Sequence, residues 1–331
     1  MRNITRLFFI TILLTLLLFS IRWVLPEEIG KHFWGADGWF MANLVESDPF
    51  PLYYRSLLTI WIHKIIYTLL SPLGVGGWQA VAVSSSLAGA IALLTLWRMN
   101  PDPAFIAVNV LCGSFLVFVG HVENYAWVNT FLILSFWSVQ RWLREEGRVR
   151  PAFVFLALAC LSHMLAVFYA PAYAYLLWKK RRYDPRDVLI PLIVFCLLIT
   201  ILSLCFQMMG TDIGLERLVP LRQVWAENQF FTLFSAKHLE ILFYFHQRAA
   251  FLGIPIELPL LALFLVRRKI DTLYLRFLLG CTICGLVWTT IWHPDWGRLD
   301  WDLFSQFGIP LHILLGFLLC RSWRSWPDNE S

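Results

Sequence analysis

Charged residues are scarce in this chain of 331 residues: 15% are Asp, Glu, Lys or Arg, and 59% are hydrophobic. Soluble domains carry about 25% charged and about 45–50% apolar residues. Long windows hold almost no charge, among them LFFITILLTLLLFSIRWVL, WQAVAVSSSLAGAIALLTLW and DVLIPLIVFCLLITILSLCF. Runs of this length and composition are typical of transmembrane helices. The composition therefore excludes a soluble protein and predicts an integral membrane protein.

The chain also lacks features that would divide it or assign it a known chemistry. It has no internal repeat, low-complexity tract or Gly/Ser-rich linker, so residues 1–331 are predicted to form a single integral membrane domain. HExxH, P-loop, GxSxG and EF-hand patterns are absent. No cofactor is therefore predicted, although the acids described below could bind a divalent cation. The net charge of +5 is explained by the positive-inside rule without nucleic-acid binding.

The cysteines and the N-terminal stretch predict neither a metal site nor a cleaved leader. All seven Cys residues lie in apolar runs, and Cys281 and Cys284 form a CxxC pair. Thiols in such a run are more often packing residues than metal or redox sites. The N-terminal stretch MRNITRLFFITILLTLLLFSIRWVLPEE begins like a signal peptide but has no small-x-small cleavage site. We therefore expect an uncleaved first span.

Basic residues predict how the chain crosses the membrane. Two segments are ambiguous, 55–70 and 151–178, and the second lies between the most basic stretches, 141–150 and 179–186. If 55–70 lies on the outer surface and 151–178 forms a hairpin, 18 of the 27 Lys and Arg lie on the cytoplasmic side and 9 outside. If each segment crosses once, the counts become 13 and 14. The positive-inside rule favours the first arrangement.

The charges on segment 55–70 support the same arrangement. Arg55 and Lys64 would each cost about 2.5–3.5 kcal/mol at the bilayer centre. An amphipathic helix in the interface avoids that cost. The hairpin halves are short, so each must tilt, thin the bilayer or enter a cavity.

The predicted fold is an all-α, polytopic transmembrane bundle of about ten crossings, with amphipathic interfacial helices on the outer face. The crossings are predicted near 5–25, 78–98, 103–120, 125–144, 152–164, 165–179, 188–208, 250–267, 272–292 and 303–321. Both termini are then cytoplasmic, and the outer loops are 26–77, 209–249 and 293–302.

Three polar clusters lie in these outer parts, at 35–50, 120–127 and 293–304. Their charged and histidine residues are Asp37, Glu46, Asp48, His121, Glu123, His293, Asp295, Arg298, Asp300 and Asp302. The clusters are far apart in the sequence but lie at one face of the predicted bundle. They could therefore converge on a cavity there.

This arrangement resembles the C-type (GT-C) membrane glycosyltransferases, which carry a catalytic acid in the first outer loop. In ADGWFMANLV, Asp37 matches that acid, and PLYYRSLLTIWIHKIIY resembles the interfacial helix that follows. GHVENY, LSHML and LFSAKHLEILFYF resemble an acid-bearing turn, a hairpin bend and an amphipathic outer helix of related bacterial proteins. Many members have two adjacent acids in this loop, whereas Gly38 follows Asp37 here.

The resemblance implies a membrane glycosyltransferase that uses a polyprenyl-phosphate-linked sugar as donor. The acceptor would be modified on the extracytoplasmic side of a bacterial inner membrane. The expected partners are the lipid-linked donor and membrane lipids. Nucleic acid is not expected, and the oligomeric state is not predicted.

Glycosyl transfer needs a carboxylate that takes the proton of the acceptor hydroxyl, and a cation that holds the leaving phosphate. Asp37, which lies among aromatic residues, is the first candidate for the base, and Glu123 is the second. Arg55 could bind a lipid phosphate or extend to phospholipid headgroups. Glu46 and Asp48 precede Pro49 and are typical of a turn.

The remaining candidates are residues for binding the substrate. His121 lies in a tight turn where it could instead cap the next helix. His163 lies at the predicted hairpin bend, where polar residues are often functional. Arg298 could bind phosphate at two points, and Trp296 could stack on a sugar ring. Asp300 and Asp302 could contribute to this site or cap the last span.

Two other classes of function are consistent with the same composition. In a multi-pass transporter or lipid flippase, Glu257, His163 and Arg276 would line a path through the membrane. Such proteins usually show paired inverted halves, which this sequence lacks. A non-catalytic membrane subunit with the same fold is the other alternative.

Overall fold

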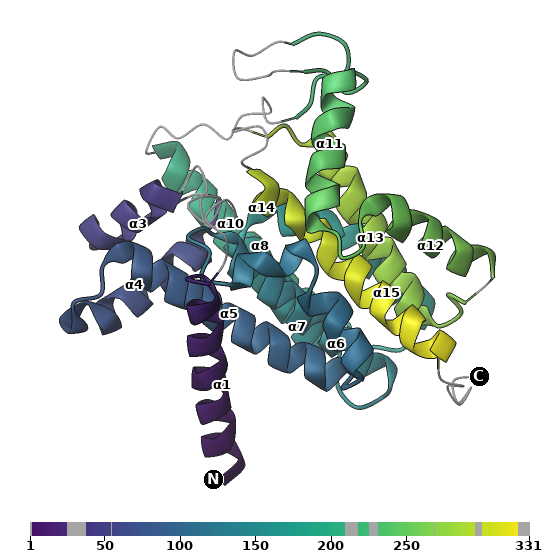
Figure 1. Ribbon diagram of the computed structural model, residues 1–331, viewed down its shortest axis with the longest axis horizontal. Helices are drawn as coiled ribbons and strands as arrows, with labels where there is room; N and C mark the ends of the chain where they lie inside the picture. The colour runs from purple at the N-terminus through teal and green to yellow at the C-terminus, as the bar shows by residue number, and fades with distance from the viewer. Residues whose placement is uncertain are drawn as a thin grey trace.

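The structure is a computed structural model that describes residues 2–24, 38–53, 55–208, 218–224, 231–267, 269–294 and 300–323. Every regular element in this part of the chain is helical, and one isolated bridge pairs Leu218 with Trp292. The α-helices are α1 (Arg2–Ile21), α3 (Gly38–Ser47), α4 (Leu57–Leu70), α5 (Gly77–Met99), α6 (Pro103–Val110), α7 (Tyr125–Leu143), α8 (Arg150–Ser162), α9 (Ala170–Lys180), α10 (Arg186–Met208), α11 (Ala236–Ala249), α12 (Ile254–Val266), α13 (Leu273–Ile291), α14 (Trp301–Phe304) and α15 (Gly308–Trp323). Short 3-10 helices are η2 (Ser71–Leu73), η3 (Gly113–Phe118), η4 (Met164–Tyr169) and η7 (Ser305–Phe307) (Figure 1). The predicted all-α class is confirmed.

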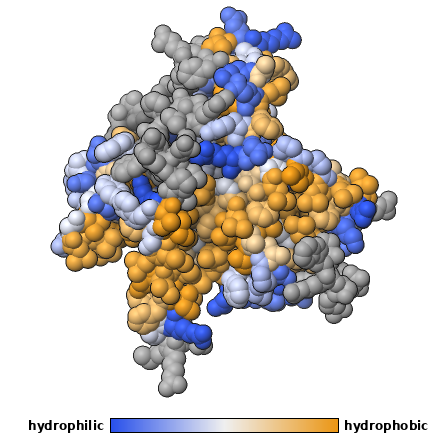
Figure 2. Space-filling model, in the orientation of Figure 1, coloured by the Kyte–Doolittle hydropathy of each residue, from blue (hydrophilic) through white to orange (hydrophobic). Residues whose placement is uncertain are grey.

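By length and composition, three helical stretches among the described residues could cross a membrane. They are α5, α13 and the run Trp301–Cys320, which joins α14, η7 and α15. The pair α11 and α12 would add a fourth, but the two are bent by 78° at their break. Figure 2 shows apolar side chains along α1 and over the side that carries α12 and α13. These features indicate a membrane protein.

Small side chains on α5 let three other helices pack closely against it. Its buried residues are mostly Ala, Ser and Gly, and α1, α4 and α7 all pack on it. A Cβ on Gly89 would lie 2.5 Å from the Cβ of Phe118, so only glycine fits at this contact. In lipid, where apolar burial no longer drives helix association, such close packing is a main source of stability.

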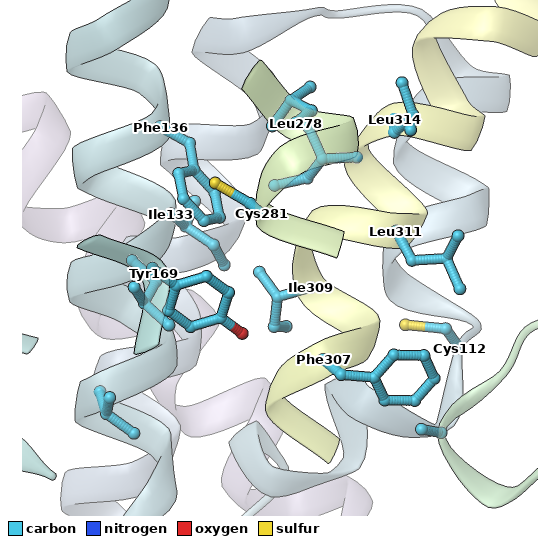
Figure 3. Packing of buried hydrophobic residues seen from close by; sticks show 14 of the residues in the cluster. Cys112, Ile133, Phe136, Tyr169, Leu278, Cys281, Phe307, Ile309, Leu311 and Leu314 are labelled. Carbon is cyan, nitrogen blue, oxygen red and sulfur yellow. The ribbon is translucent and has the colours of Figure 1, made fainter. Parts of the chain in front are cut away.

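The main core lies where α7, η4, α13 and α15 meet, as Figure 3 shows. The ring of Phe136 packs edge-on against Tyr169 and Phe277, with centroids 6.3 and 5.8 Å apart. Cys281 points into this core as a fully buried free thiol, and Cys284 is half-buried. Within the described residues, no group of three potential metal ligands exists. Cys281 and Cys284 therefore lie in an apolar environment that is typical of packing residues.

The two basic stretches lie together at one end of the bundle. Arg150, at the start of α8, forms a 2.8 Å ion pair with Asp187, at the start of α10. Lys180, at the end of α9, lies 3.7 Å from Glu145. The chain from the start of α8 to the end of α9 therefore leaves this end and comes back to it. The predicted return is confirmed, while its position in a membrane stays a prediction.

The third predicted span, 103–120, is not continuous. Helix α6 ends at Val110, and the 3-10 helix η3 begins at Gly113. The break is held by the end of α11, because the Gly113 amide donates to the Ala250 carbonyl over 3.2 Å. The hydroxyl of Ser114 adds bonds to the carbonyls of Ala249 and Ser305. These partners are distant in the sequence, so the apolar run alone did not predict the break.

Helices α3 and α4 form a separate layer beside the start of α5 (Figure 1). The 14 residues of α4 span about 21 Å, which is shorter than a bilayer core of about 30 Å. One face of α4 is buried, at Thr59, Ile60 and His63. Its other face exposes Ile65 and Leu69 by 56% and 70%. Helix α4 is thus too short to cross a bilayer core of that thickness, and its interfacial position stays a prediction.

Candidate functional site

The candidate site lies at the end of the bundle that is opposite the basic stretches. Helix α7 begins there at Tyr125, and α8 ends there at Ser162. Helix α4 closes this end, since the Thr59 hydroxyl donates to the Ser162 carbonyl over 3.2 Å. The turn 120–124, the bend at His163 and the start of α14 also lie at this end.

A chain of hydrogen bonds runs from α7 through α5 and α4 into the turn. The indole of Trp127 donates to Ser84 over 2.9 Å, and the Ser84 hydroxyl donates to Nδ1 of His63 over 2.7 Å. Nε2 of His63 then donates to the carbonyl of Glu123 over 3.3 Å. Ser84 and His63 each accept one bond and donate the next, so the neutral imidazole is held in a single tautomer. Burial lowers the pKa of His63 to about 4.

This turn carries a buried acid and receives the first residue of α3. Glu123 is 3% exposed. A Cβ on Gly38 would lie only 2.6 Å from the carbonyl oxygen of Val122, so the backbones of α3 and the turn are in direct contact. Asp37, the predicted base, directly precedes Gly38 in the sequence and lies outside the described residues.

The polar cluster at 293–304 contacts the same turn through Asp302. Nε2 of His121 donates to Oδ2 of Asp302 over 2.6 Å, and the two side chains are 1% and 3% exposed. The ring of Trp301 lies 5.6 Å from that of His121. On the other side of Trp301, the guanidinium of Arg248 lies 4.8 Å from the ring centre, a cation–π contact. Asp300 occupies the N-cap position of α14, but its side chain makes no capping hydrogen bond, so the capping role considered from the sequence is not shown.

Arg22 connects the end of α1 with the turn. Its guanidinium donates to the carbonyl of Gly120 and lies 5.2 Å from the ring centre of Trp78. The side chain is 8% exposed, so this cation is almost completely enclosed. Gly120 has φ of +67°, a left-handed conformation that glycine adopts without strain.

His163 and Arg55 also meet at this end. The amide of Met164 donates to the carbonyl of Arg55 over 3.4 Å. The backbone at His163 is extended, and its Nδ1 accepts a 3.4 Å bond from the amide of Leu165. The ring of Tyr125 lies 5.4 Å from the imidazole. The predicted bend is thus brought against both α7 and the loop before α4.

Three other acids have structural partners. Oε2 of Glu46 accepts from the Gly77 amide over 2.8 Å and so stabilises the start of α5. Oδ1 of Asp48 accepts from the Phe50 amide over 2.8 Å, which confirms its interpretation as a turn residue. Glu257 accepts from the amides at 251 and 252, at the bend between α11 and α12, and lies 3.3 Å from His312. That arrangement explains a carboxylate in an apolar helix without a transport path.

Several residues at this end carry no signal in the sequence. Arg22, His63, Ser84 and Arg248 were not predicted as site residues. Their partners belong to distant segments, so no local pattern marks them. Conversely, the predicted residues Trp296 and Arg298 lie outside the described residues.

Chemically, this end combines a buried carboxylate, a histidine–carboxylate pair and the enclosed guanidinium of Arg22. Such groups can accept a proton and bind an anion. Comparison of the chain with protein-family models, curated proteins and solved structures found no significant match.

Proposed function

We propose that the chain is a membrane glycosyltransferase of the GT-C type. It would move a sugar from a polyprenyl-phosphate donor to an acceptor on the extracytoplasmic side. The observation that carries this proposal is the convergence of the 120–124 turn, the His163 bend and the start of α14 at one end of the bundle. A transferase that meets its lipid donor at one membrane face needs its polar groups at that face.

In the proposed reaction, the acceptor oxygen attacks the anomeric carbon, and the bond from that carbon to the phosphate oxygen breaks. The acceptor proton passes to a carboxylate, for which Asp37 is the first candidate and Glu123 the second. Gly38, next to Asp37, packs on the turn that contains Glu123, so both acids belong to adjoining segments. The His121–Asp302 pair would orient the turn, and Asp300 lies at the same helix start.

The leaving polyprenyl phosphate needs positive charge close to it. Arg55, beside the His163 bend, is one donor of that charge. Arg298 is a second candidate, and Trp296 would stack on the sugar. Within the described residues no three potential metal ligands gather. Asp37 and Asp295 lie outside that part of the chain, and a divalent cation at the acids stays a prediction.

The proposal includes the topology of about ten crossings, with both termini in the cytoplasm of a bacterial cell. Two facts support it. The basic stretches 141–150 and 179–186 share one end, and the candidate site occupies the other. The bend of 78° also separates α11 from α12, which suits an outer amphipathic helix that is followed by a span.

The experiment that tests the function is transfer from a polyprenyl-phosphate sugar by the purified protein in lipid. Asp37→Asn keeps the side-chain size and removes the basic carboxylate, so transfer should fall by about 10²–10⁴-fold. Glu46→Gln is the matched control, because its amide oxygen can still accept from Gly77. Glu46→Gln should therefore keep most of the activity.

Full activity of Asp37→Asn would shift the role of base to Glu123. The proposed function would be contradicted if the wild-type protein transfers no sugar from any hexose donor and if surface glycans and lipid-linked sugars are the same with and without the gene.

A further inference from the structure

The end of the bundle opposite the candidate site carries more positive charge than its own acids neutralise. This basic end consists of residues 141–150 and 179–187, which together hold nine Lys and Arg residues and four acids. The ion pairs Arg150–Asp187 and Lys180–Glu145 place the two stretches side by side. An excess of five positive charges therefore collects at this end, and it equals the net charge of the whole chain.

The acids of the basic end already have partners in the protein. Two of them form the ion pairs just described, and Glu146 lies 4.0 Å from Nε of Arg141. Oδ1 of Asp184 accepts a hydrogen bond from the amide of Arg186 over 2.9 Å. The side chains of the remaining cations are all exposed, and these residues are Arg144, Arg148, Lys179, Arg181, Arg182 and Arg186. They are accessible to an anion from outside the protein.

These cations lie where an exposed apolar surface of the bundle begins. Helix α10 packs on α8, and its first turns expose Leu189 and Ile190 by 50% and 49%. Arg186 lies one turn before these side chains in the same helix. At the end of α9, Trp178 is 58% exposed, and Nζ of Lys179 lies 4.1 Å from the centre of its ring. Tryptophan and lysine side chains in such positions are typical of the boundary between membrane and water.

Soluble anions and lipid headgroups can both offer a phosphate to these cations, and the position of the cations favours a lipid. The acyl chains of a phospholipid can lie along the apolar side chains of α10 while its phosphate meets the cations one turn away. Charge and apolar contact then act together. A soluble anion would contact the cations alone, and salt screens exposed charges. Basic surfaces next to membrane helices attract anionic headgroups for this reason.

We propose that the basic end binds the headgroups of anionic phospholipids, in the leaflet on that side of the membrane. The lipid phosphates would supply the negative charge that the four acids of this end do not provide. They would also hold the start of α8, the end of α9 and the start of α10 at the membrane surface. This inference does not depend on the proposed glycosyltransferase function, because the candidate site lies at the other end of the bundle.

The test uses the purified protein in phosphatidylcholine vesicles that contain a trace of spin-labelled phosphatidylglycerol or spin-labelled phosphatidylcholine. The fraction of each labelled lipid that the protein immobilises, measured by EPR spectroscopy, gives the preference for the anionic headgroup. The wild type should prefer phosphatidylglycerol, and the preference should fall in about 1 M NaCl, where charges are screened beyond about 3 Å. Arg181→Gln/Arg182→Gln should lower the preference by about fivefold, the factor expected for even one cation close to an anionic surface.

Arg222→Gln/Lys237→Gln is the matched control, because it also removes two exposed cations but leaves the basic end intact. This variant should keep the preference of the wild type. Arg181→Lys/Arg182→Lys keeps both charges and should keep it as well. If Arg181→Gln/Arg182→Gln does not fold, Arg144→Gln/Arg148→Gln removes two exposed charges from the other stretch, with the same expected loss.

Three outcomes would overturn the inference. The first is a preference that Arg181→Gln/Arg182→Gln leaves unchanged. The second is an equal loss in Arg222→Gln/Lys237→Gln, because the lipid would then respond to the net charge of the protein and not to the basic end. The third concerns the source of the phosphate. If glycerol phosphate, which has the headgroup phosphate but no acyl chains, removes the preference at constant ionic strength, the cations bind a soluble anion and not a lipid.

Discussion

His121 and Asp302 are 181 residues apart in the sequence and form a buried hydrogen bond of 2.6 Å. This bond joins the turn before α7 to the start of α14. A histidine–carboxylate pair with side chains 1% and 3% exposed is shielded from water and from salt. The two helices are thereby fixed to each other at the candidate site.

Removal of one partner from this pair should cost more than removal of both. His121→Leu leaves the Asp302 carboxylate buried without its donor, a loss of about 3–5 kcal/mol in the free energy of unfolding. The double variant His121→Leu/Asp302→Leu should recover about 0.5–3 kcal/mol relative to the sum of the single changes. Denaturant unfolding in detergent measures all three variants. Additive effects would show that the two side chains do not interact.

Replacement of Gly38 should disturb the contact between α3 and the turn. The new Cβ of Gly38→Ala would lie 2.6 Å from the Val122 carbonyl oxygen, and both groups are backbone-bound, so one segment must shift. Overpacking of this kind typically costs about 1–3 kcal/mol. We expect a lower Tm and a lower rate of sugar transfer.

Gly147→Ala is the control for this substitution, since a Cβ there meets nothing within 4 Å. The control should match the wild type in both Tm and transfer. A Gly38→Ala protein with wild-type Tm would mean that the close approach to Val122 is absent.

His63 should make stability depend on pH. Burial lowers its pKa in the folded protein to about 4, below the ordinary value of 6.5. Between these values the unfolded chain binds a proton that the folded protein does not bind. The stability from neutral His63 is therefore complete above pH 6.5 and is lost as the pH falls toward 4, by up to about 1.4 kcal/mol per pH unit.

His63→Gln tests this dependence, because glutamine is neutral at every pH and can still donate to the Glu123 carbonyl. The wild type should be more stable than the variant at pH 7.5, and the difference should narrow as the pH falls to 5. Thermal unfolding in detergent at several pH values measures it. A difference that is constant with pH would contradict a buried neutral histidine.

Much of the fold could be predicted because local sequence patterns determine the helices and the end of the bundle at which they begin or stop. Apolar runs predicted the helices, and the basic stretches around 151–178 predicted its return to one end, which the Arg150–Asp187 pair confirms. The break between α6 and η3 was not predicted, since the amide of Gly113 is held by Ala250, far along the chain. Local patterns record the helices but not such distant hydrogen bonds.

The candidate site was predictable to a smaller extent. The sequence showed polar clusters that could converge, and the contact between His121 and Asp302 brings two of them together. It did not show that His63 would be buried and hydrogen-bonded at both nitrogens. Nor did it show Arg248 against Trp301, because no sequence signal tells whether a cation on an amphipathic helix packs on an aromatic ring or extends into solvent.

The orientation in the membrane provides the last prediction. Single cysteines would replace Gly147 and Tyr183 at the basic end, and Lys237 near the start of α11, in a protein without the exposed Cys196. A membrane-impermeant thiol reagent, added to intact cells, should label position 237 and leave 147 and 183 unlabelled until the membrane is opened. The positive-inside rule is the reason, since the basic stretches share one end of the bundle. Labelling of 147 from outside would reverse the topology and would place the candidate site at the cytoplasmic face.

Labelling of 147 but not 183 would contradict the hairpin itself, because the ion pairs Arg150–Asp187 and Lys180–Glu145 require both positions to lie on one side.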